Sequence, residues 1–251
     1  MEIIDLSLEV NEDTRVPSID TGISDPPVKF ESWVEIEHEG FKITKIEMGA
    51  HAGTHCDFPS HWVKEGKSSS NFPIETWVGW AIVLDFRGTG PITIERLLAY
   101  KKRIVKKSNV IPVLLNDFND VLTEAARKEL ISWRPQAIVM GEGVNVNENM
   151  EDSSEFLRSE VPMVMNIDHE KAALVKDNDL IVAAPVKFSQ LEASPVRVIA
   201  IRGLSEAREA CHNGDSASNI AEKEETIALL ERKIGQLTLQ LESVKQKGEK
   251  N

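Results

Sequence analysis

The sequence predicts a mixed α/β domain with a sheet-rich core over residues 1–205, followed by a helical tail. Three observations support this prediction. Short apolar runs bounded by turn residues recur along the first 205 residues, which is typical of strands. Segments of helical character are few there, and this favours a sheet with helices on its outside. Beyond residue 205 the apolar residues thin out, and a heptad pattern begins at Ile220.

The strand predictions rest on alternating or continuous apolar runs. Residues 11–29 are rich in Pro, Asp, Ser and Gly and should form a long loop. The next two runs should pair as a hairpin, with Glu39-Gly40 at the turn. The expected strands are residues 1–10, 30–37, 41–48, 81–86, 110–115, 137–140, 161–167, 180–185 and 196–201.

Two segments have helical periodicity. The first begins at Thr93, a suitable N-cap residue, and continues to about Lys107. The second covers residues 123–132. Both should pack against the outside of the sheet.

Residues 206–219 contain the turn-forming run Asn-Gly-Asp-Ser at 213–216 and are expected to be a linker. Residues 220–251 predict a coiled-coil helix, with Lys223 the single break in its seam. We therefore expect a homo-oligomer, dimeric or higher, to which this tail contributes. A helix that packs on its own domain is the alternative. The seam residues are Ile220, Ile227, Ile234 and Leu241 at one position and Leu230, Leu237 and Val244 at the other.

Composition excludes several classes of protein. The 29 basic and 41 acidic residues give a net charge of −12, which argues against a nucleic-acid partner. Two cysteines cannot staple a disulfide-rich scaffold. The N-terminus lacks the basic start and apolar run of a signal peptide, and no apolar stretch is long enough to cross a membrane. We expect a soluble, cytoplasmic protein without a membrane partner.

Half of the six histidines fall in residues 51–61, which read HAGTHCDFPSH. Gly53 and Pro59 argue against a regular helix here, so an extended or looped segment is expected. In an extended segment His55 and Asp57 point the same way, and Gly53 permits a bend that returns His51 to the same centre. Two imidazoles and one carboxylate suit zinc, manganese or ferrous iron and leave positions free for water or substrate.

The other residues of the segment receive separate roles. His61 lies beyond Pro59 and is the candidate acid/base, because a histidine titrates near neutral pH. Cys56 should face away from Asp57 and serve packing. Phe58 and Trp62 are candidates to line a substrate pocket. The alternative for the histidines is that they only cap loops and form structural hydrogen bonds.

The segment 51–61 resembles the His-x-Gly-Thr-His-x-Asp-x-Pro-x-His signature of the cyclase family, which includes bacterial kynurenine formamidases and isatin hydrolases. Similarity extends to residues 3–7, 79–85, 91–93 and 194–200, so it covers roughly residues 1–203 and not the tail. The signature is long and mixed in residue type, which makes it specific.

The resemblance implies a sheet-rich cyclase-like fold of the swivelling β/β/α type. It implies that His51, His55 and Asp57 are metal ligands, with zinc or manganese as cofactor, and that His61 is the catalytic acid/base. It also implies a metal-dependent hydrolase of a small-molecule amide, with N-formylkynurenine, an intermediate of tryptophan catabolism, as the best-known substrate of one branch. Another cyclic amide or ester is the alternative substrate.

The second half of the chain departs from the family pattern. Met165 stands where the family has an acidic or amide ligand, and Ser153-Ser154 stand where it has a histidine. A thioether is a poor ligand for zinc or manganese. Solvent could complete the shell, or the site could be weakened and the protein serve assembly. Substitute ligands could come from His169 or from Glu142, Glu148, Glu151 and Asp152.

Overall fold

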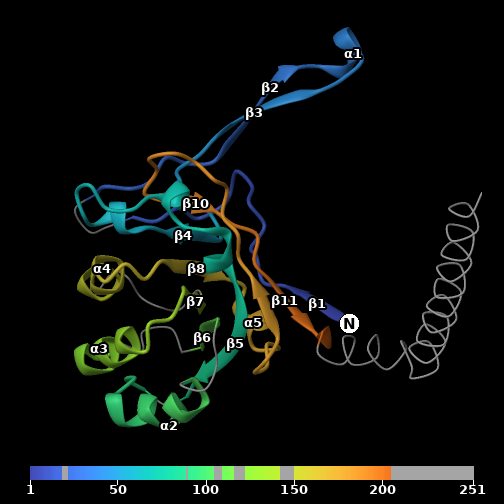
Figure 1. Ribbon diagram of the computed structural model, residues 1–251. Helices are drawn as coiled ribbons and strands as arrows, with labels where there is room; N and C mark the ends of the chain where they lie inside the picture. Colours follow the sequence, from blue (N-terminus) through green and yellow to red (C-terminus); the bar gives the residue numbers. More distant parts are fainter. Residues whose placement is uncertain (19–21, 89, 105–108, 116–121, 142–149, 205–251) are drawn as a thin grey trace, which may run out of the picture. The chain divides into compact units, whose positions relative to one another are not determined.

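The computed structural model describes residues 1–18, 22–88, 90–104, 109–115, 122–141 and 150–204. Within these residues a mixed sheet of nine strands forms the centre of the unit Met1–Arg202 (Figure 1). Its strand order is β1-β11-β9-β5-β6-β7-β8-β4-β10. The strands are β1 (Glu2–Asp5), β4 (His55–Asp57), β5 (Val78–Asp85), β6 (Val110–Leu115), β7 (Ile138–Gly141), β8 (Met163–Ile167), β9 (Leu180–Val182), β10 (Ala193–Pro195) and β11 (Ile199–Arg202).

Four neighbouring strands, β5 to β8, run parallel. Parallel neighbours need crossover connections, and one helix lies in each of the three. These are α2 (Ile94–Ile104), α3 (Glu124–Ser132) and α4 (Met150–Arg158), which Figure 1 shows on one face of the sheet. The Thr123 hydroxyl caps α3 by accepting a hydrogen bond from the Ala126 amide at 3.4 Å.

Each face of the sheet carries its own hydrophobic core, because successive strand residues point to opposite faces. On β6, Leu114 packs toward the helices with Leu130 and Phe156, in what we call the helix-side core. The neighbouring Val113 packs toward the other face, in the far-side core. β6 is therefore apolar throughout, as expected of a parallel strand covered on both faces.

A second, two-stranded sheet stands apart from the main sheet. It consists of β2 (Lys29–Val34) and β3 (Ile43–Glu47), joined by the short helix α1 (Ile36–Glu39). Gly40 ends α1 with a φ of 78°, a left-handed conformation that suits glycine. We call residues 29–47 the hairpin arm, and Figure 1 shows it extending away from the main sheet.

Most of the predicted elements are present. The hairpin and both predicted helices are confirmed, although the first strand is shorter than expected. The strands β4 and β10, the helix α4 and the short helix α5 (His169–Ala172) were not predicted. Three 3₁₀ helices complete the elements: η1 (Pro59–His61), η2 (Ser69–Asn71) and η3 (Ile74–Trp77). No helix among the described residues is long and apolar enough to span a bilayer. The predicted linker and coiled-coil tail lie outside the described residues.

Candidate metal centre

The histidine-rich segment enters the sheet as β4, between β8 and β10. His55 lies opposite Met165 and Asp57 opposite Met163, and both methionines belong to the helix-side core. Residues directly opposite each other share a face, so His55 and Asp57 point to the helix side. Cys56 points the other way and is fully buried in the far-side core, which confirms its predicted packing role.

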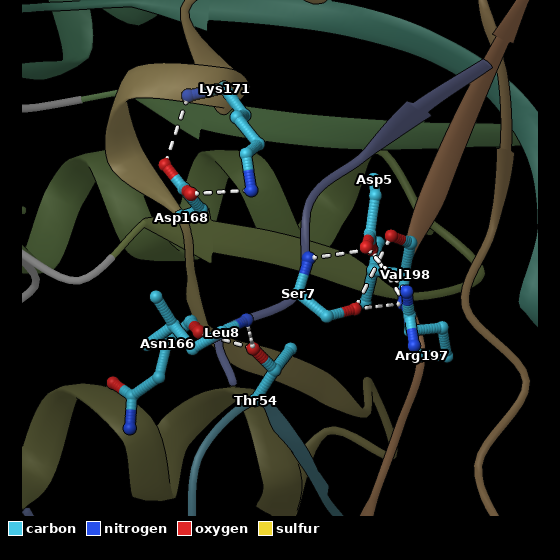
Figure 2. A network of polar contacts seen from close by, with 9 residues as sticks. All are labelled: Asp5, Ser7, Leu8, Thr54, Asn166, Asp168, Lys171, Arg197 and Val198. Carbon is cyan, nitrogen blue, oxygen red and sulfur yellow. Dashed lines mark hydrogen bonds and ion pairs between the residues drawn. The ribbon is translucent and has the colours of Figure 1, made fainter. Parts of the chain in front are cut away.

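The Gly-Thr pair of the motif holds this segment in place. The Thr54 hydroxyl donates to the Asn166 carbonyl at 2.7 Å and accepts from the Leu8 amide at 2.9 Å, as Figure 2 shows. It thereby ties the motif to the end of β8 and to the segment after β1. Gly53 has a φ of 67°, and a Cβ there would approach a Val10 methyl group to 2.6 Å. Both the conformation and the space require glycine at this position.

Each of the first two histidines is oriented through its Nδ1 atom. His51 Nδ1 lies 2.9 Å from Asp25 Oδ2, and His55 Nδ1 lies 2.9 Å from the Gly53 carbonyl oxygen. A carbonyl or carboxylate oxygen only accepts, so Nδ1 carries the proton in each neutral ring. The Nε2 atoms of both rings are then left with free lone pairs. A histidine oriented in this way through its other nitrogen is characteristic of metal sites.

The free Nε2 atoms converge on one carboxylate oxygen. Asp57 Oδ1 lies 3.4 Å from His55 Nε2 and 3.7 Å from His51 Nε2. Both His51 Nε2 and Asp57 Oδ1 are buried, and neither has a hydrogen-bond partner among the described residues. Buried polar atoms almost always have partners, and these acceptor atoms face one another instead. A cation between them would satisfy all three.

The donor set fits a divalent metal. Two ligands about 2.1 Å from one zinc at a tetrahedral angle are about 3.4 Å apart. The two separations, 3.7 and 3.4 Å, are close to that value. As they stand, no three or more His, Cys, Asp or Glu side chains in the described part of the chain are arranged to hold a metal ion. Small rotations of the rings would bring the three side chains around one cation. The centre would consist of His51, His55 and Asp57.

His61 lies at the open side of this centre, at the end of η1. Its ring centroid is 4.7 Å from that of His51, and its side chain is exposed. Burial of part of the ring lowers the pKa of His61 below its ordinary value; nearby Asp57 and Glu192 oppose this, while His51 and His55 add to it. A neutral, accessible imidazole next to the ligands is suited to proton transfer.

Trp62 follows His61 and is partly buried against the helix-side core. Its ring meets the His61 ring edge-on with centroids 5.4 Å apart. The buried indole Nε1 has no hydrogen-bond partner within the described residues. This donor beside His61 is compatible with the predicted pocket role, which stays a prediction.

Phe58 is placed differently from the expectation. Its side chain is fully buried in the far-side core, where it packs against Phe72 and Trp77. The strand alternation that points Asp57 to the helix side points Phe58 away from it. The prediction that Phe58 lines a substrate pocket is therefore wrong in this structure.

The second half of the chain brings no further ligand to the centre among the described residues. His169 begins α5, where its Nδ1 lies against Gly141 at the end of β7. Met165 lies opposite His55 with only 4% of its surface exposed, so an apolar side chain adjoins the ligands at that point. The side chains of Glu142, Glu148, Glu151, Asp152 and Ser153 lie outside the described residues.

Two residues of the site were missed in the sequence. Asp25 lies in the predicted loop 11–29, and only the fold brings its carboxylate to His51. Glu192 precedes β10, and its carbonyl accepts a hydrogen bond from the Phe58 amide at 2.8 Å, which holds its side chain near His61. No local pattern marked either residue, because both act on partners 26 or more positions away in the chain.

The chain is similar to known proteins over most of its described residues. Residues 4–117 match the family model of the cyclase family, described as putative cyclase. The kynurenine formamidase of Bacillus thuringiensis (strain Al Hakam) is 26% identical over 214 residues, which is 79% of this chain and 96% of that protein. A kynurenine formamidase of Bacillus cereus is 27% identical over 221 residues, with the same coverage.

Solved structures share the fold. Isatin hydrolase A from Labrenzia aggregata has a TM-score of 0.67 at 20% identity, covering 79% of this chain and 93% of its own. A predicted metal-dependent hydrolase from Bacillus stearothermophilus has a TM-score of 0.58 at 17% identity, covering 79% and 97%. This chain is therefore similar to the cyclase family in the matched segment 4–117, in its curated relatives and in its fold.

Proposed function

We propose that this protein is a divalent-metal-dependent hydrolase of the C–N bond of a small amide. The observation that carries the proposal is the convergence of His51 Nε2 and His55 Nε2 on Asp57 Oδ1, with two of these three atoms buried and unpartnered. Neutral imidazoles and a carboxylate suit zinc or manganese. When bound, such a cation supplies Lewis acidity to the substrate carbonyl and to a water molecule.

The protein's own groups handle the proton. His61 accepts a proton from the attacking water and delivers it to the leaving nitrogen, so that the C–N bond breaks to give an amine and a carboxylic acid. Its position supports this role, because the ring is next to His51 yet open to solvent. Asp25 and the Gly53 carbonyl keep the two ligand rings oriented throughout.

The relatives suggest the substrate class. The two Bacillus proteins compared above are kynurenine formamidases, so an aryl formamide such as N-formylkynurenine is the first candidate. Trp62, beside His61, could pack against an aromatic ring of such a substrate. A different cyclic amide or ester is the alternative within the same chemistry.

The proposal is tested by metal content and turnover. Protein purified without added metal should contain about one zinc or manganese per chain, and Asp57→Ala should lose it. His61→Ala should keep the metal and lose turnover of formyl anilides, including N-formylkynurenine. His38→Ala, which removes an exposed histidine of α1, is the matched control and should change neither. Wild-type protein that holds no metal even after reconstitution would contradict the proposal.

Met165 favours a second candidate, a weakened site in a protein whose task is assembly. The residue opposite His55 is a buried thioether, which offers little to a hard or borderline metal ion. This candidate predicts no turnover across formyl anilides and cyclic amides, with an oligomer that depends on residues 220–251. An oligomer that is unchanged after removal of this tail would count against it.

A further inference from the structure

Two buried methionines lie beside the ligands of the metal centre. On β8, Met165 is directly opposite His55, and Met163 is directly opposite Asp57. Both methionines are buried, with 4% and 1% of their surface exposed. Residues opposite each other share a face of the sheet, so the two thioethers lie on the same side as the two ligands. The β8 side of the centre is therefore an apolar wall.

The strand register brings this wall close to the ligands. The Phe58 amide donates to the Glu192 carbonyl, on the β10 side of β4. Backbone groups of an antiparallel strand alternate between its two neighbours, so those of Asp57 and His55 point to β8. His55 and Met165 therefore form a hydrogen-bonded pair, whose Cα atoms are about 5.5 Å apart. The Met165 side chain consequently adjoins the His55 ring.

The strand on the other side of β4 offers no ligand either. On β10, Ala193 lies opposite Asp57 and Pro195 lies opposite His55. Neither side chain carries a donor or acceptor atom. Within the described residues, the strands that flank β4 thus add nothing to the set of His51, His55 and Asp57. Further positions around an ion are left to water or substrate.

The space for such water is limited. The three ligand residues are themselves buried, with at most 9% of their surface exposed. The exposed His61 ring marks the open side of the centre, whereas Met165 closes the β8 side. An ordered water molecule needs two to four polar partners, and a thioether wall supplies none of good quality. Water is therefore expected on the His61 side and not beside Met165.

The separations between ligand atoms favour four ligands over six. With bonds of about 2.1 Å, neighbouring ligands are about 3.4 Å apart around a tetrahedral ion and about 3.0 Å apart around an octahedral one. Asp57 Oδ1 lies 3.4 Å from His55 Nε2 and 3.7 Å from His51 Nε2, which matches the wider value better. Zinc is commonly tetrahedral, whereas manganese favours octahedral sites rich in oxygen.

We propose that Met165 determines the metal selectivity of this centre. Its apolar side chain occupies the place from which β8 would otherwise offer a ligand, and it keeps additional water out. This arrangement suits four-coordinate zinc and disfavours six-coordinate manganese. Met165 acts by excluding a ligand and not by binding the ion. The inference rests on the proposed function, because it concerns the same centre, and it selects zinc from the two ions considered there.

The two affinities test the proposal in the full-length chain. Equilibrium dialysis of chelator-treated protein against zinc and against manganese measures each. Most nitrogen and oxygen sites bind zinc more tightly than manganese, so the informative quantity is the change in the ratio. Met165→Gln offers an oxygen ligand at the same place and should raise manganese affinity relative to zinc by about tenfold or more, the scale on which residues around metal ligands act. Met165→Leu stays apolar and should leave the ratio unchanged.

Met140→Gln is the matched control for an amide placed in the core. Met140 belongs to the same helix-side core and is equally buried, but it lies on β7, which β8 separates from β4. This variant should change neither affinity. Urea unfolding checks that each variant is folded. Met165→Leu conserves volume and apolar character, so it is expected to fold even if a buried amide is not tolerated.

The absorption spectrum of bound Co²⁺ reports the number of ligands without a polar substitution. Four-coordinate Co²⁺ absorbs visible light much more strongly than six-coordinate Co²⁺. Wild type and Met165→Leu should both give the intense spectrum, and Met165→Gln a weaker one.

Several outcomes would overturn the inference alone and leave the metal centre in place. These are a weak, six-coordinate Co²⁺ spectrum of the wild type, a metal ratio that Met165→Gln does not change, and a loss of zinc binding in Met165→Leu, which would show that the thioether binds the ion. A wild type that bound neither zinc nor manganese would overturn the proposed function itself, and this inference with it.

Discussion

The Asp25 carboxylate and the His51 imidazole are joined by a 2.9 Å contact between Oδ2 and Nδ1. Asp25 lies four residues before β2 and His51 lies four residues after β3. The chain segments that enter and leave the hairpin arm therefore meet at this contact. The contact leaves His51 Nε2 facing Asp57. Orientation of one metal ligand therefore depends on a residue from the loop that leads into the arm.

Removal of this contact should weaken metal binding. Residues that hydrogen-bond a metal-ligating histidine typically contribute about 10–100-fold to metal affinity. We expect Asp25→Ala to reduce Co²⁺ or Zn²⁺ affinity by about that factor and Asp25→Asn, which can still accept through its amide oxygen, to lose less. Titration followed by the Co²⁺ absorption spectrum measures both. Asp13→Ala, in the exposed turn after β1, is the control. Equal affinity of wild type and Asp25→Ala would refute the role of Asp25 while leaving the metal site intact.

Gly53→Ala should destabilise the domain by about 2–4 kcal/mol, through a strained positive φ and overpacking. The added Cβ would approach the Val10 methyl group to 2.6 Å. Urea unfolding measures the loss. Gly88→Ala has a similar φ of 68° but open space around its Cβ, so it should cost only the backbone strain. The difference between the two variants isolates the clash, and equal losses would argue against it.

Thr54→Val should cost about 1–3 kcal/mol, because it removes the donor to the Asn166 carbonyl and the acceptor of the Leu8 amide while keeping the side-chain shape. Thr54→Ser retains the hydroxyl and should cost less. Chemical unfolding of both variants provides the measurement. A Val variant as stable as the Ser variant would mean that the hydroxyl bonds of Figure 2 contribute little.

Asp5 should make a small contribution to acid sensitivity. The hydrogen bond from Arg197 holds the pKa of Asp5 below its ordinary value. A depressed carboxyl pKa stabilises the folded protein above the unfolded-state pKa of about 3.9, and this stability is lost as pH falls through the lower folded-state pKa. The Asp5 side chain is 38% exposed and that of Arg197 is 75% exposed, so solvent screens the pair and the effect should be small. Arg197→Met should reduce stability slightly at pH 7 and leave stability unchanged at about pH 2. Loss at both pH values would point to packing of the Arg197 side chain instead.

Local sequence patterns determined several features of this protein. Alternation along residues 55–57 predicted that His55 and Asp57 share a face and that Cys56 packs behind them, and the structure shows this arrangement. Turn residues predicted the hairpin, and the capping residue Thr93 predicted the start of α2. These features follow from near neighbours in the chain, through side-chain direction and backbone geometry. The helix α4 was missed because its apolar contacts come mainly from Phe156 and Leu157, too few to produce a helical period.

Only the tertiary structure decided which distant residues meet at the centre. The pairing of β4 with β8 brought Met165 opposite His55, and the return of the chain from the arm brought Asp25 to His51. The same pairing places the Phe58 side chain in the far-side core. Strand register and loop path are set by the packing of the whole sheet, because a shift of one residue would reverse every side chain of β4. The sequence by itself therefore determined the ligand types and their common face, whereas the fold determined what orients them.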